Sequence, residues 1–133
     1  MDYPDNKEIK SKNLTQYFTC RIEGLNKIEF KIDNSKSLGS LDLKLFECRD
    51  KGNQLVANSN IEISPKLEWC SLEFEKIKDS AGKKYALELS AKKDFYPIAS
   101  RGCLYPLHLL ESKGQKISHT SLCIKTTCQK NHN

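Results

Sequence analysis

The sequence predicts an all-β protein: an antiparallel two-sheet β-sandwich, jelly-roll-like, with about eight or nine strands. Three observations predict this class. Apolar side chains recur at every second residue along most of the chain, turn-forming residues separate these stretches roughly every 8–12 residues, and no stretch is convincingly helical. With 133 residues, the chain is long enough for one domain with a buried core and is not expected to form two.

Strand patterns follow one another along the chain. Apolar and polar side chains alternate in 14–20, 28–33 and 41–46, and again in 70–75 and 85–89. Further strand-like stretches are 55–57, 61–63, 103–110 and 117–125. The stretch around Tyr85 also fits a helix, but we interpret it as a strand because Gly82 can close a tight hairpin with the strand before it. Pro106 is tolerated at a sheet edge or a bulge. The apolar phase predicts a core of Phe18, Cys20, Phe30, Leu43, Cys70, Leu72, Phe74, Tyr85 and Leu87.

The two ends of the chain lack this pattern. We expect 1–13 and 126–133 to be flexible tails around a folded domain at 14–125. No apolar run approaches the roughly 20 residues that cross a bilayer, and the N-terminal residues have no hydrophobic signal core. The sequence therefore predicts a cytoplasmic protein with no membrane span.

The charge does not indicate a nucleic-acid partner. Lys and Arg number 22 against 17 Asp and Glu, a net charge of +5. The lysines alternate with acidic residues along the strands, as on the solvated face of a sheet, whereas nucleic-acid surfaces concentrate basic residues with aromatic rings between them. Asp33, Asp42, Glu47 and Asp50 form no calcium-loop pattern, and we interpret them as solvated charges.

The six cysteines are expected to be free thiols, mostly in the core, because no secretion signal precedes them. A zinc set could be made from His119, Cys123, Cys128 and His132, but no Cys-x2-Cys pair is present, and we expect no metal and no cofactor. Cys103 and His108 would lie about 16 Å apart along an extended strand, too far for a catalytic pair. Motifs of hydrolases and nucleotide-binding loops are also missing, so the sequence predicts a protein that is not an enzyme.

One segment has a more distinctive pattern. It consists of Leu67-Glu68-Trp69-Cys70-Ser71-Leu72-Glu73-Phe74, then Ile77, Asp79-Ser80, Gly82-Lys83 and Tyr85. This pattern resembles one in bacterial, notably cyanobacterial, proteins of surface-polysaccharide synthesis, where a β-sandwich module accompanies glycosyltransferase or methyltransferase domains. The resemblance covers roughly 16–91. It implies a non-catalytic jelly-roll module related in architecture to carbohydrate-binding domains.

A sandwich that binds sugars needs flat exposed aromatic rings and a few polar side chains. Trp69 is out of phase with Cys70 and Leu72, which favours a position facing away from the core, although a lone Trp in a sandwich is often packed. Phe95 is a further aromatic in the loop-rich last third of the chain. The candidate ligand-binding residues are Trp69, Tyr96, Arg101, Tyr105 and His108.

Two functions remain open at this point. The first is carbohydrate recognition, or an accessory role, in bacterial glycan synthesis, with a saccharide as ligand. The second is a protein–protein interaction or assembly module with no sugar ligand, whose partner would be a glycosyltransferase or another protein.

Overall fold

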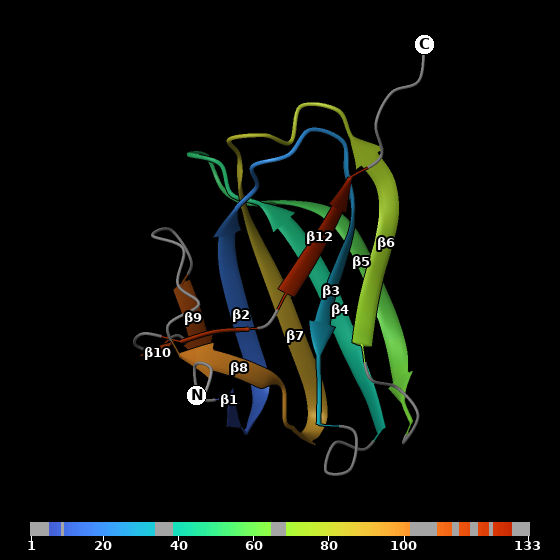
Figure 1. Ribbon diagram of the computed structural model, residues 1–133, viewed down its shortest axis with the longest axis vertical. Coiled ribbons are helices and arrows are strands. Elements are labelled where there is room, and N and C mark those ends of the chain that lie inside the picture. Colours follow the sequence, from blue (N-terminus) through green and yellow to red (C-terminus); the bar gives the residue numbers. More distant parts are fainter. Residues whose placement is uncertain are drawn as a thin grey trace, which may run out of the picture.

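Figure 1 shows the computed structural model of the chain. The structure describes residues 6–8, 10–33, 39–64, 69–101, 109–112, 115–117, 120–122 and 124–128. Within these ranges every regular element is a strand and no helix is present, so none that could cross a membrane is found there.

The described residues form twelve strands. In chain order they are β1 (Asn6–Glu8), β2 (Ser11–Thr19), β3 (Leu25–Lys31), β4 (Gly39–Glu47), β5 (Gln54–Ile63), β6 (Trp69–Ile77), β7 (Lys84–Phe95), β8 (Ile98–Arg101), β9 (Leu109–Ser112), β10 (Gln115–Ile117), β11 (Thr120–Leu122) and β12 (Ile124–Cys128). The predicted eight or nine strands are too few because the short strands β1 and β8–β11 hold only three or four residues each, too few to display an alternating pattern. The limits of the predicted domain, 14–125, stay a prediction.

The strands form a sandwich of two antiparallel sheets. The large sheet has the order β10-β9-β2-β7-β4-β5, and the small sheet has the order β12-β3-β6. In Figure 1 the small sheet lies across the face of the large one. Consecutive strands cross between the sheets, from β2 to β3, from β3 to β4 and from β6 to β7, which is a jelly-roll-like winding. A third group, β1-β8-β11, is also antiparallel. The predicted fold class is confirmed.

The core lies between the two sheets, where the apolar phases of their strands meet. Of the nine predicted core residues eight are buried, and Phe74 is half-buried against the core. The stretch that also fitted a helix is strand β7, which pairs with β2 on one side and β4 on the other, so its Tyr85, Leu87 and Leu89 all face inward.

Gly82 lies in the turn between β6 and β7, as predicted, but the tight hairpin expected there is wrong, because β6 belongs to the small sheet and β7 to the large one. Gly82 has φ +83°, a left-handed conformation that costs other residues about 1–2 kcal/mol. Its N–H donates to the Cys20 carbonyl at 2.7 Å, and the Cys20 N–H donates to the Lys83 carbonyl at 2.9 Å. The turn that carries the chain from one sheet to the other is thereby tied to the end of β2.

Candidate functional site

The outer face of the small sheet carries Trp69. In the register of β3 and β6, Trp69 lies opposite Lys31, Ser71 opposite Glu29, and Glu73 opposite Lys27. On the other side of β3, Lys125 of β12 lies opposite Glu29. Because directly opposed residues share a face, these side chains form one outward-facing surface, which we call the Trp69 face.

Trp69 itself lies outside the core. Its side chain is half-buried, whereas the neighbouring Cys70 and Leu72, in the other phase, are buried between the sheets. Two ammonium groups lie over its indole ring: Lys125 Nζ is 4.1 Å and Lys31 Nζ 5.3 Å from the ring centroid. Each such cation–π contact is worth about 0.5–1 kcal/mol at an exposed position. The lysines therefore hold the ring in place and cover part of it.

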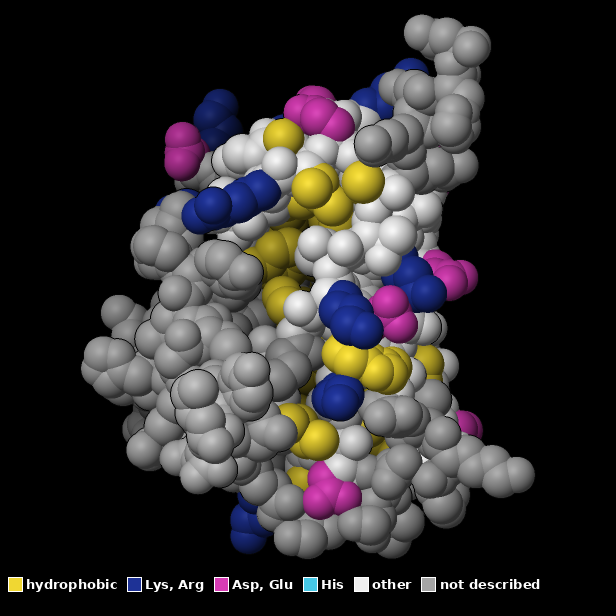
Figure 2. Space-filling view, viewed as in Figure 1, with side chains coloured by type: hydrophobic (Ala, Val, Ile, Leu, Met, Phe, Trp, Pro, Cys, Tyr) yellow, Lys and Arg dark blue, Asp and Glu magenta, His cyan; other side chains and the backbone are white. Residues whose placement is uncertain are grey.

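The other charges of the Trp69 face pair with one another and leave one net negative charge. Lys27 Nζ lies 3.8 Å from Glu29 Oε1 and 3.5 Å from Glu73 Oε1, so both carboxylates share this one lysine. Among the described residues, neither Lys31 nor Lys125 has a carboxylate within ion-pair distance. Figure 2 shows basic, acidic and hydrophobic side chains close together where β3, β6 and β12 lie.

Tyr96 lies at the same end of β3 as Trp69. Its carbonyl accepts a hydrogen bond from the Asp33 N–H at 2.8 Å, two residues beyond Lys31, and its side chain is half-buried. The candidate Phe95 is wrong as a displayed ring, because its side chain is 1% exposed, in phase with the inner face of β7.

The remaining candidates cannot be placed on the Trp69 face. Arg101 ends β8, and its side chain lies outside the described part of the chain. Tyr105 and His108 fall outside the described residues altogether. Their assignment as ligand-binding residues stays a prediction.

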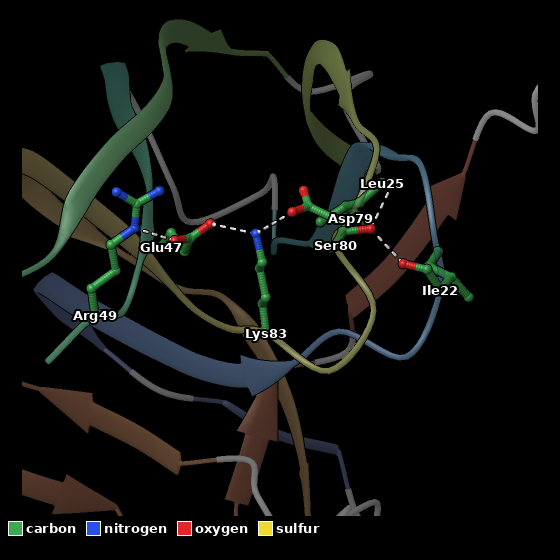
Figure 3. A network of polar contacts seen from close by, with 7 residues as sticks. All are labelled: Ile22, Leu25, Glu47, Arg49, Asp79, Ser80 and Lys83. Carbon is green, nitrogen blue, oxygen red and sulfur yellow. Dashed lines mark hydrogen bonds and ion pairs between the residues drawn. The ribbon is translucent and has the colours of Figure 1, made fainter.

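At the other end of β3 the distinctive sequence pattern has a structural role. Ser80 is fully buried, and its Oγ accepts a hydrogen bond from the Leu25 N–H at 3.1 Å and donates one to the Ile22 carbonyl. Figure 3 shows this hydroxyl between the β6–β7 turn and the β2–β3 loop. Because Leu25 and Lys31 are six residues apart on an extended strand, the turn lies about 20 Å from the Trp69 end.

An ion cluster joins the same turn to β4. Lys83 Nζ lies 3.0 Å from Asp79 Oδ2 and 3.5 Å from Glu47 Oε1, and Arg49 donates to the other oxygen of Glu47 (Figure 3). The hydrogen bond from Arg49, with the charge of Lys83, holds the pKa of Glu47 below its usual range although burial acts against this. Glu47 is 7% exposed, so its interpretation as a solvated charge is wrong. Its phase with Leu43 and Leu45 is the signal that could have shown this.

A pocket of about 420 Å³ opens beside this end of the fold. It is lined by 18–22, at the end of β2, and by Ile124 and Thr126 of β12. Its volume falls in the range of small-molecule sites, and its lining combines the apolar Phe18, Ile22 and Ile124 with the polar Thr126. The other lining residues are Thr19, Cys20 and Arg21, so the described lining holds one thiol and one cation but no carboxylate or imidazole.

Two of the described cysteines have thiols that are harder to ionise than usual. Cys20, Cys48, Cys70 and Cys128 are free thiols, and burial raises the pKa of Cys70 to about 12 and also raises that of Cys48. The described residues contain no group of three or more His, Cys, Asp or Glu placed to hold a metal. Of the possible zinc set only Cys128 is described; His119, Cys123 and His132 lie outside the described residues.

The outer face of the large sheet carries an apolar row that the sequence patterns did not single out. Tyr17 lies opposite Ala86, Ala86 opposite Phe46, and Phe46 opposite Leu55. Leu55 is 44% exposed, and its strand β5 forms one edge of the described sheet. This row was missed because strand order, which periodicity does not reveal, is what brings the four residues together.

Comparison with known proteins shows the fold alone. No protein-family model matches the sequence, and no curated protein matches it. Among solved structures, the chain is similar to a crystal structure that contains the cysteine protease and lectin-like domains of Cwp84, a surface layer associated protein of Clostridium difficile. The TM-score is 0.60 and the sequence identity is 12%. The match covers 90% of this chain and 32% of that one, so the chain spans about a third of its length.

Proposed function

We propose that the protein is a non-catalytic carbohydrate-recognition module whose ligand binds at the Trp69 face. The observation that carries the proposal is the position of Trp69: a half-buried indole on the outer face of the small sheet, surrounded by side chains that can exchange hydrogen bonds. Sugar rings present apolar C–H faces edged with hydroxyls, and an aromatic ring beside Ser71, Glu29 and Glu73 offers partners for both.

The structural likeness supports this proposal. The solved structure that the chain resembles includes a lectin-like domain as well as a cysteine protease domain. Since fold does not by itself imply function, the weight of the proposal rests on Trp69 and its neighbours.

The setting that we propose is bacterial glycan synthesis, in the cytoplasm and beside a glycosyltransferase. The pattern of 67–85 supports it by resemblance, and free thiols, such as the four cysteines in the described part of the chain, are typical of a reducing compartment. Co-purification of the tagged chain with a glycosyltransferase encoded beside it would support this setting, and a neighbourhood without glycan-synthesis genes would oppose it.

The test of sugar recognition begins with a glycan array and continues with titration of each ligand found. Trp69 is the one tryptophan of the chain, so its fluorescence reports directly on this face. We expect Trp69→Ala to weaken binding, measured by calorimetry, at least about tenfold, the size typical of an aromatic anchor in a binding site. The control Leu55→Ala removes an exposed apolar side chain from the other sheet and should leave binding unchanged.

A second candidate function, contact with another protein, is favoured by the exposed Leu55 on edge strand β5. Light scattering over a range of protein concentrations distinguishes the two. The protein contact would be supported by a concentration-dependent oligomer that is lost in Leu55→Ser. If in addition no glycan of the array binds, the sugar proposal is refuted.

A further inference from the structure

Lys31 and Lys125 are the unusual feature of the Trp69 face. Two ammonium groups lie 5.3 and 4.1 Å from the centroid of one indole, and no carboxylate of the described residues pairs with either. The same face pairs Lys27 with both Glu29 and Glu73, so carboxylates are present nearby but are used by another lysine. The result is a basic patch centred on the aromatic ring.

The chain brings these two lysines together from distant positions. Lys31 ends β3 and lies directly opposite Trp69, while Lys125 reaches the ring from β12, on the far side of β3. Asp33, beyond the end of β3, and Glu75, further along β6, are the other described acidic residues near this face, and neither is within ion-pair distance of the two lysines. The patch is therefore positively charged where the ring lies.

This arrangement discriminates between classes of sugar. A saccharide that stacks on the indole must displace at least part of the lysine cover, and a neutral sugar returns only hydroxyl hydrogen bonds for the cation–π contacts that are lost. An anionic sugar gives each displaced ammonium a new partner, and hydrogen bonds between ionised groups are roughly twice as strong as neutral ones. The lysines thus oppose the binding of neutral sugars and favour the binding of anionic ones.

We propose that the ligand of the Trp69 face is an acidic saccharide, whose ring stacks on Trp69 while its anionic group pairs with Lys31 and Lys125. This inference rests on the proposed function and names its ligand class. The shared chemistry is an oxyanion on a sugar ring, which is either the carboxylate of a uronic acid or a sulfate ester. Both present paired oxygens that accept hydrogen bonds from the two ammonium groups.

The test uses the 133-residue chain and a panel of matched pairs. Uronic-acid oligosaccharides are compared with their methyl esters, which have the same rings without charge, and sulfated oligosaccharides with their desulfated forms. Binding is followed by Trp69 fluorescence at 0.1 M salt, where the Debye length is about 10 Å. We expect at least one acidic oligosaccharide to bind and its neutral counterpart to bind about ten- to twenty-five-fold more weakly, from two ion pairs of about three- to fivefold each.

Three variants locate the effect. Lys31→Met and Lys125→Met keep the length and apolar stem of the side chain but remove its charge, and each should weaken acidic binding about three- to fivefold. The matched control Lys44→Met removes an exposed lysine from the outer face of the large sheet, and it should leave affinity unchanged. All three change the net charge equally, so a difference between them is a difference of position.

The outcomes separate this inference from the function beneath it. If charged and neutral partners bind equally, and calorimetry shows that Trp69→Ala loses this binding, the acidic ligand is overturned and sugar recognition stands. Equal losses in Lys44→Met and Lys125→Met would show attraction by net charge alone and would also overturn it. If no saccharide of the panel or of the glycan array binds, both the acidic ligand and sugar recognition at the Trp69 face are refuted.

Discussion

Replacing Ser80 with alanine tests the account of the β6–β7 turn. The Ser80 hydroxyl serves two backbone groups, the Leu25 N–H at 3.1 Å and the Ile22 carbonyl, and its side chain is 0% exposed. Alanine leaves both groups without this partner. A buried polar group left unpaired costs about 1–3 kcal/mol. With this range for the buried Leu25 N–H and about 1 kcal/mol for the part-buried Ile22 carbonyl, we expect a loss of about 2–4 kcal/mol in the free energy of unfolding.

The loss can be measured by circular dichroism during thermal and urea unfolding. At an unfolding entropy of about 2.1 cal/mol/K per residue, a chain of this length loses about 3.6 °C of Tm for each kcal/mol, which predicts a decrease of about 7–14 °C. The control Ser59→Ala removes an exposed hydroxyl on β5 and should stay within about 0.5 kcal/mol of the wild type. A Ser80→Ala loss no larger than that of the control would refute the role of the hydroxyl.

Three further predictions concern stability and reactivity. Because the pKa of Glu47 is lowered in the fold, its ion pairs should stabilise the protein fully above the ordinary pKa of about 4.3 and lose this effect as the pH falls through the lower folded value. The difference in free energy of unfolding between wild type and Glu47→Gln, measured in urea, should therefore decrease from pH 7 to pH 3. A constant difference would contradict this prediction. Cys70, with a pKa raised to about 12, should resist alkylation by iodoacetamide at pH 8 until urea unfolds the chain, as mass spectrometry of peptides can show. Alkylation of Cys70 in the folded protein as fast as in urea would disprove its burial. Gly82→Ala should cost about 1–2 kcal/mol and Gly82→Asn less, since Asn tolerates the left-handed conformation, whereas equal costs would argue against strain at φ +83°.

Much of the fold could be predicted from the sequence because it depends on local alternation. The phase of β3, β4 and β7 identified buried residues correctly, and the turn at Gly82 followed from its need for positive φ. Glu47 was misinterpreted because charge was given more weight than phase, and a buried carboxylate becomes tolerable only with the cations that Arg49 and Lys83 supply.

The candidate site was less accessible to sequence reasoning. The outward position of Trp69 followed from its phase, but the contact with Lys125 depends on β12 adding to β3, a pairing between strands almost a hundred residues apart. Alternation shows which side of a strand is buried and does not show which strand lies beside it. The basic patch on the indole therefore emerges only from the assembled sheet.

Comparison of Trp69→Phe with Trp69→Ala tests the central claim, sugar recognition at this face, most directly. The ligand is the tightest-binding saccharide of the array, the measurement is calorimetry, and circular dichroism confirms that each variant is folded. The account predicts that phenylalanine, which retains a flat ring, keeps part of the affinity, while alanine loses at least about tenfold. Unchanged affinity in a folded Trp69→Ala variant would contradict it.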